Sequence, residues 1–104
     1  MKEDKSTYVL VRRDLKMRRG KEIAQGIHAV GGLGYTHGSP VIVLQAEDEQ
    51  HLVDLANEAH ACRVPFHLVH DAGKTEVDPG TMTAIAIGPV EKGFLGLLTI
   101  AALY

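Results

Sequence analysis

A loop that leads into a predicted helix carries the first residues whose types and spacing could do chemistry. Gly20 and Lys21 stand at this junction, where free backbone N–H groups and an ammonium group would together attract an anion. Gln25 and His28 follow Lys21 by four and seven positions, which on a helix places the three side chains on one side. The segment lacks the G-x-x-x-x-G-K-S/T pattern of a Walker motif, so it indicates only a general anion site.

A second polar segment begins where another predicted strand ends. Asp71 follows an apolar run, Gly73 permits a turn or a close backbone approach, and Thr75 adds a hydroxyl group. The alternative is a tight polar turn in which the aspartate bonds to its own backbone, and this segment alone favours that alternative.

Basic residues gather at the start of the chain, although the formal net charge is -2. Of the 11 Lys and Arg residues, eight fall within the first 21 positions: Lys2, Lys5, Arg12, Arg13, Lys16, Arg18, Arg19 and Lys21. Such a local patch can attract phosphates even when the whole chain is slightly acidic. An arbitrary basic cluster, however, more often only solvates a surface.

Alternating strands and helices are predicted to position these residues. Apolar runs predict strands at residues 8–11, 41–44, 66–69 and 82–87, the last ended by Gly88-Pro89. Helical spacing predicts one helix from Lys21 to the glycines near position 32, and another at 47–61. The order implies a mixed sheet with helices on both faces, in which the third and fourth strands are antiparallel. Because parallel strands share a carboxyl edge, Lys21 and Asp71 should meet in one cleft.

Composition narrows the class of protein. The chain has 104 residues, 45% of them apolar and 23% charged, which predicts a single globular domain over 1–104. One cysteine, Cys62, excludes an internal disulfide and suits a reducing cytosol, and we expect it to be a small buried residue. The longest apolar run is too short to span a bilayer, so we expect a cytoplasmic protein without membrane association. No histidine pair has chelate spacing, so no metal or cofactor is expected.

Both polar segments resemble motifs of the type 2 peptidyl-tRNA hydrolases. Residues 14–29 are similar to the family's D-L-K-M-G-K-G-K opening and its following helix with A-Q and H-A. Residues 71–89 are similar to its D-A-G-K/R-T-Q, P-G-T-x-T and G-I-G-P run, and residues 40–44 and Leu103-Tyr104 also resemble it. The resemblance implies a three-layer α/β/α sandwich around a four-stranded mixed β-sheet. It also implies hydrolysis of the ester between peptide and tRNA in peptidyl-tRNA, and a homodimer.

The resemblance implies particular site residues. The catalytic set would be Lys21, His28, Asp71, Thr75 and Thr83. The substrate-binding set would be Arg12, Arg13, Lys16, Arg18, Arg19, Gln25, Gly73 and Lys74. In our hypothesis Asp71 orients or deprotonates water that Thr75 holds, while Lys21 neutralises an oxyanion or a phosphate. His28 would assist proton transfer or bind the terminal nucleotide.

Several positions depart from the family pattern. Arg18 and Arg19 stand where Gly-Lys is common, Gly26 replaces a larger residue, and Glu76 replaces a glutamine. An alternative function is therefore a catalytically weak or inactive relative that binds RNA or a protein partner through the same basic residues near the start of the chain. A third reading, an unrelated α/β domain in which both segments are turns, is disfavoured by two motifs in the right order.

Overall fold

The computed structural model describes residues 5–34, 36, 38–73 and 77–104. Its elements follow the predicted order, and all four strands are longer than the apolar runs that predicted them. They are β1 (Ser6–Arg12), α1 (Arg19–Leu33), β2 (Val41–Ala46), α2 (Glu49–Ala61), β3 (Phe66–His70), β4 (Met82–Val90), the 3-10 turn η1 (Lys92–Phe94) and α3 (Gly96–Thr99).

The four strands form one mixed sheet in the order β2-β1-β4-β3. β1 pairs with β2 in parallel, and β4 lies antiparallel to both β1 and β3. β1, β2 and β3 therefore point the same way, and their carboxyl ends share one edge of the sheet. The predicted mixed sheet, and the antiparallel relation of the third and fourth strands, are confirmed.

One predicted boundary was wrong, because β4 does not end at Gly88-Pro89 but continues to Val90. A register shift between Ser6 and Tyr8 on β1 lets Val90 pair with Ser6 beyond the irregular point. Gly88 also donates its N–H to the Pro65 carbonyl at 2.9 Å, an ordinary length for a backbone hydrogen bond. The end of β4 is thus hydrogen-bonded on one side to β1 and on the other to Pro65, just before β3.

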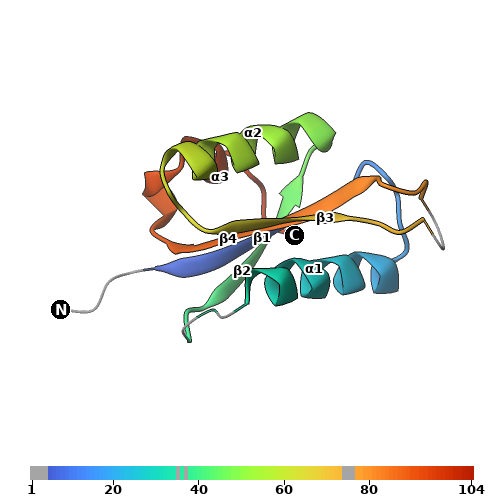
Figure 1. Cartoon of the computed structure of the whole chain (residues 1–104), viewed down its shortest axis with the longest axis horizontal. Coiled ribbons are helices and arrows are strands. Elements are labelled where there is room, and N and C mark those ends of the chain that lie inside the picture. Colours follow the sequence, from blue (N-terminus) through green and yellow to red (C-terminus); the bar gives the residue numbers. More distant parts are fainter. Residues whose placement is uncertain (1–4, 35, 37, 74–76) are drawn as a thin grey trace.

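The helices lie on opposite faces of the sheet, with α1 on one side and α2 on the other (Figure 1). Side chains alternate between the faces along each strand, so two buried clusters form. Leu10, Leu44 and Ile85 pack with α2, whereas Val9, Val11 and Ala84 belong to the cluster that includes Ala29 of α1. The predicted α/β class is confirmed.

α2 follows the sequence pattern closely. Its apolar stripe is buried and consists of Leu52, Leu55, Ala56 and Ala59. Asp48 caps the helix by accepting a hydrogen bond from the His51 N–H at 2.9 Å. Cys62, however, is exposed at the end of this helix, so the expectation of a buried thiol was wrong. The chain has already left the core where the helix ends.

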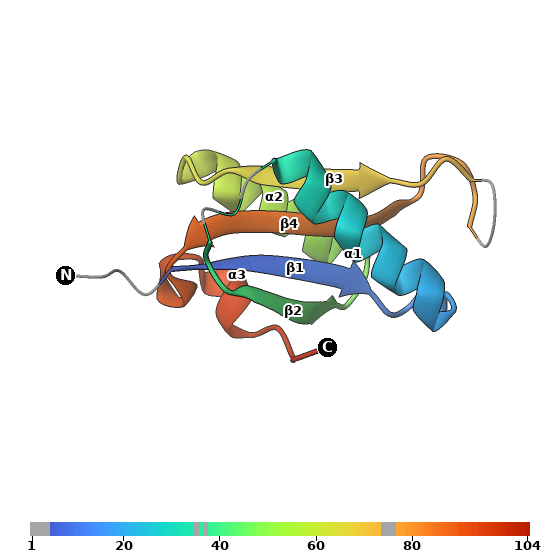
Figure 2. The same cartoon turned by 90° about the horizontal axis from the view of Figure 1, so that it is seen from below.

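α1 buries a face that its apolar residues do not mark. The buried residues are Glu22, Gln25 and Ala29, while Ile23 and Ile27 are 52% and 65% exposed. The reason is that α1 packs on β4, β3 and β1 (Figure 2), which leaves its apolar side beside the uncovered β2. Glycine ends the helix as predicted, with Gly34 at φ 100°.

Candidate active site

The carboxyl edge of the sheet joins two residues that are 50 positions apart. Lys21 on α1 donates from Nζ to Oδ1 of Asp71 at 2.6 Å, and Asp71 follows β3 directly. Their side chains are only 14% and 7% exposed. The structure thus brings together the lysine and aspartate that the shared strand edge predicted.

Two further residues, both buried, form a hydrogen-bonded chain that leads to this pair. Gln25 donates from Nε2 to Asp71 Oδ1 at 3.4 Å, and its Oε1 accepts a hydrogen bond from Thr83 Oγ1 at 2.5 Å. Thr83 is fully buried and Gln25 is 3% exposed. Thr83 therefore contacts Gln25 rather than the open site, and it orients the amide so that the nitrogen faces the carboxylate.

The loop after β3 fixes the aspartate backbone. The Asp71 N–H donates to the Thr81 carbonyl, and the Asp71 carbonyl accepts from the Gly80 N–H, both at 2.8 Å. Gly73 donates its N–H to Asp71 Oδ2 at 2.6 Å and has φ 77°. A Cβ there would lie 2.4 Å from the Pro79 nitrogen, so only glycine fits. Gly73 thus holds the aspartate, and its N–H is already occupied.

These contacts keep Asp71 ionised. The hydrogen bond from Lys21 lowers the pKa of the Asp71 carboxyl, burial acts in the opposite direction, and the Gly73 N–H lowers the pKa further. At neutral pH the group is therefore a carboxylate that can only accept hydrogen bonds. It can hold and polarise a water molecule.

An open groove between α1 and β3 leads to the pair and has a volume of about 620 Å³. Lys21, His28 and Asp71 line it together with His67 and His70. The groove thus contains three of the five expected catalytic residues. His67 and His70 were not predicted as site residues, although His67 shares its strand parity with Val69, which faces α1.

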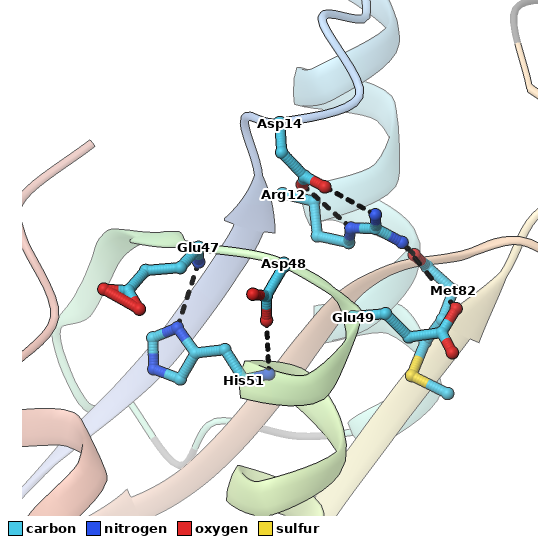
Figure 3. Close-up of polar contacts among 7 residues, drawn as sticks. All are labelled: Arg12, Asp14, Glu47, Asp48, Glu49, His51 and Met82. Atoms are coloured by element: carbon cyan, nitrogen blue, oxygen red, sulfur yellow. Dashed lines mark hydrogen bonds and ion pairs between the residues drawn. The ribbon is translucent and has the colours of Figure 1, made fainter.

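The expected basic contacts divide into two groups. Arg12 is only 8% exposed, and its donors are directed at the protein (Figure 3). It bonds Asp14 from Nε and Nη2 at 2.9 and 2.6 Å, and the Met82 carbonyl from Nη1 at 3.0 Å. Arg12 therefore directs these donors at the end of β1 and the start of β4 rather than at solvent.

The other predicted phosphate contacts are exposed on or next to the loop before α1. We call Lys16, Arg18 and Arg19 the basic rim, and all three are exposed. Arg13 is also exposed, but its Nε lies 3.1 Å from Oε2 of Glu22 and its guanidinium lies 4.9 Å from the centre of the Tyr104 ring. Lys74 and Thr75, which the resemblance also implies, lie outside the described residues.

Within residues 5–34, 36, 38–73 and 77–104, no three His, Cys, Asp or Glu side chains form a group that could hold a metal ion. In the same part of the chain, no helix combines the length and the apolar character needed to cross a membrane.

The fold and the site define an α/β protein with a buried carboxylate–lysine pair at the carboxyl edge of a mixed sheet. The sequence model of the family described as Peptidyl-tRNA hydrolase PTH2 matches residues 34–99. The peptidyl-tRNA hydrolase of Methanocaldococcus jannaschii is 35% identical over 95 residues, which cover 78% of this chain and 83% of that protein. That of Methanococcus vannielii is 31% identical over 106 residues, covering 88% and 90%. The chain belongs to the PTH2 family of peptidyl-tRNA hydrolases.

Proposed function

We propose that this chain hydrolyses the ester bond between peptide and tRNA in peptidyl-tRNA, and that the Lys21–Asp71 pair is where it does so. Family membership supports the reaction. The observation that supports the site is the 2.6 Å contact between the Lys21 ammonium and a nearly buried carboxylate at the end of an open groove. Charged pairs held at the end of a cleft are typical of acid–base sites.

The lowered pKa of Asp71 favours one of the two roles considered for it. A carboxylate whose pKa is lowered is a poor store for a proton at neutral pH, but a good acceptor of a hydrogen bond. We therefore assign Asp71 to orienting and polarising the attacking water. The water oxygen bonds to the ester carbonyl carbon, and the bond from that carbon to the ribose oxygen breaks. One water proton ends on the ribose oxygen, and the other is released to solvent as the new carboxyl group of the peptide ionises.

Lys21 supplies positive charge where the ester carbonyl oxygen becomes negative. An ammonium group in a site largely shielded from solvent stabilises such an oxyanion far better than water does. Gln25 and Thr83 are positioning residues, because they contact Asp71 and each other behind the open groove. The basic rim would hold tRNA phosphates beside the ester.

The wider expectations also remain proposals. We propose a single domain over 1–104, a cytoplasmic location that follows from a substrate made during translation, and a homodimer. The dimer would use the exposed surface between α1 and β2. It is formed by Ile23 and Ile27 of the helix and by Val41 and Val43 of the strand. A two-fold contact would bury this surface on both copies at once.

The experiment that tests the function is hydrolysis of a labelled peptidyl-tRNA by the purified chain, followed as release of free tRNA. We expect multiple turnovers per protein molecule without added metal. A protein that binds the labelled tRNA at the basic rim but releases no peptide would instead support the non-catalytic alternative.

A further inference from the structure

The groove at the catalytic pair continues along α1, away from the basic rim. Lys21 and Asp71 lie at one end, and His28 and His67 line the groove farther along. Gly32 lies opposite His67, and the 11 residue steps from Lys21 to Gly32 span roughly 16 Å of helix. The basic rim lies just before Lys21, at the N-terminal end of α1, whereas Gly32 lies near its C-terminal end. An ester bound at Lys21 and Asp71 therefore has the groove on one side and the basic rim on the other.

The His67 ring is seated directly on the backbone of α1. A Cβ at Gly32 would lie 2.1 Å from His67 Cδ2 and 2.2 Å from Nε2. Only a residue without a side chain leaves room for the ring at this point. The width of the groove therefore depends on Gly32.

One wall of the groove is the unpaired edge of a strand. Among the described residues, β3 pairs with β4 alone and forms one end of the sheet (Figure 2). The other end strand, β2, is bridged by the last residues of the chain, since the N–H groups of Gln45 and Tyr104 donate to the carbonyls of Ala102 and Val43. An open strand edge can accept an extended peptide through main-chain hydrogen bonds.

We propose that this groove binds the peptide part of the substrate, with its last residues extended along the free edge of β3. The proposal rests on the proposed function, because the occupant must be bonded to the ester at Lys21 and Asp71. The tRNA is a polyanion and fits the basic rim, which leaves the peptide for the opposite side. Main-chain hydrogen bonds suit a peptide of any sequence, and His28 and His67 add polar contacts.

The experiment uses a matched pair of glycine variants and substrates that differ in peptide length. Gly32→Ala pushes the His67 ring into the groove, whereas Gly31→Ala meets no atom within 4 Å. Both changes raise helix propensity by about 1 kcal/mol, so they share their effect on α1. The probes are non-hydrolysable amide-linked analogues that carry one, two or four amino acids on the same tRNA.

We expect the affinity of the unchanged protein to rise with peptide length by roughly tenfold, the scale of one or two net hydrogen bonds. Gly32→Ala should remove that increase, and Gly31→Ala should keep it. An N-methyl group on the second residue from the ester should also weaken binding, because it blocks a main-chain donor. Affinity that does not depend on peptide length in any of the three proteins would overturn the proposal.

A different occupant is equally detectable. If Gly32→Ala weakens a deacylated tRNA and the peptide analogues by the same factor, the groove binds the terminal nucleotides and the proposal is wrong. Failure of the proposed function is seen separately, as absence of hydrolysis of the ester-linked substrate. Binding of the amide analogues does not depend on that reaction.

Discussion

α1 separates two unlike surfaces. On its β3 side lies the groove with Lys21 and Asp71, where the charged groups are paired. On its β2 side lies an apolar depression of about 550 Å³, flanked by Ile23, Ile27 and Val43. One helix therefore buries polar residues while it exposes isoleucines, the reverse of the usual amphipathic arrangement.

The difference shows what permits polar burial. Gln25 is buried because Thr83 and Asp71 are its partners, and Glu22 is buried because Tyr104 and Arg13 are its partners. A buried polar group without such partners would cost about 1–3 kcal/mol. The polar side of α1 is thus specified by particular contacts, whereas Ile23 and Ile27 on its apolar side remain exposed.

The largest expected effect concerns Lys21. Lys21→Ala should lower turnover by about 10²-fold or more, because it removes the charge beside the developing oxyanion. It should also raise the pKa of Asp71, since the hydrogen bond from Lys21 is the main cause that lowers it while burial raises it. Because the proposed reaction uses the Asp71 carboxylate, the acid limb of the pH–rate profile should move to higher pH. An unmoved acid limb would contradict the pairing.

Asp71 also links the pair to stability. Because its folded pKa is lowered, it contributes stability above its ordinary value of about 3.9, and that stability is lost as pH falls through the folded pKa. Asp71 is buried at 8% exposure, so its replacement affects folding as well as the reaction. Unfolding curves must therefore accompany each turnover measurement.

A smaller effect is expected from Thr83→Val, which leaves the buried Gln25 Oε1 without its donor. We expect a loss of about 1–3 kcal/mol in the free energy of unfolding, and roughly tenfold slower turnover because the amide is no longer fixed. The matched control is Thr7→Val. Thr7 is also fully buried and bonds Ser39 Oγ at 2.8 Å, but it lies at the start of β1, at the opposite edge of the sheet from Asp71. Equal turnover in the two variants would remove Gln25 and Thr83 from the positioning of the site.

The basic rim should contribute to binding rather than to the chemical step. Replacing Lys16, Arg18 and Arg19 by glutamine should flatten the dependence of tRNA affinity on salt, by roughly one unit of slope for each phosphate that the rim no longer neutralises. Arg63→Gln is the control, because Arg63 is exposed beyond α2. Arg12→Gln should instead lower stability, since Arg12 is held by Asp14 and Met82. An unchanged slope in the triple variant would show that the basic rim does not bind tRNA phosphates.

The smallest effect on the isolated chain is expected on the apolar side of α1. Ile27→Lys should change the free energy of unfolding of the monomer by no more than about 0.5 kcal/mol, because Ile27 is 65% exposed. If a second copy binds there, sedimentation should show the dimer of the unchanged protein and the monomer of the variant. Ile100→Lys is the control, at 69% exposure outside that surface. A dimer that survives Ile27→Lys would place the interface elsewhere.

The sequence predicted the meeting of Lys21 and Asp71 because it required only the order and direction of the strands. Other contacts needed the angle at which α1 crosses the sheet, which no periodicity encodes. That angle places His67 in the groove and Gln25 over Thr83. The burial of Arg12 was not predicted for a related reason: β1 is buried on both faces, so alternation along it does not reveal which side chains are exposed.

The most direct test of the central claim compares two aspartates near the same loop. Asp71→Asn and Asp78→Asn make the same chemical change, but Asp71 is buried beside Lys21 and Asp78 is exposed. In single-turnover hydrolysis of labelled peptidyl-tRNA with protein in excess, we expect Asp71→Asn to be slower by about 10²-fold or more, and Asp78→Asn to stay within about twofold of the unchanged protein. Equal rates for the two folded variants would show that the Asp71 carboxylate does not carry the reaction.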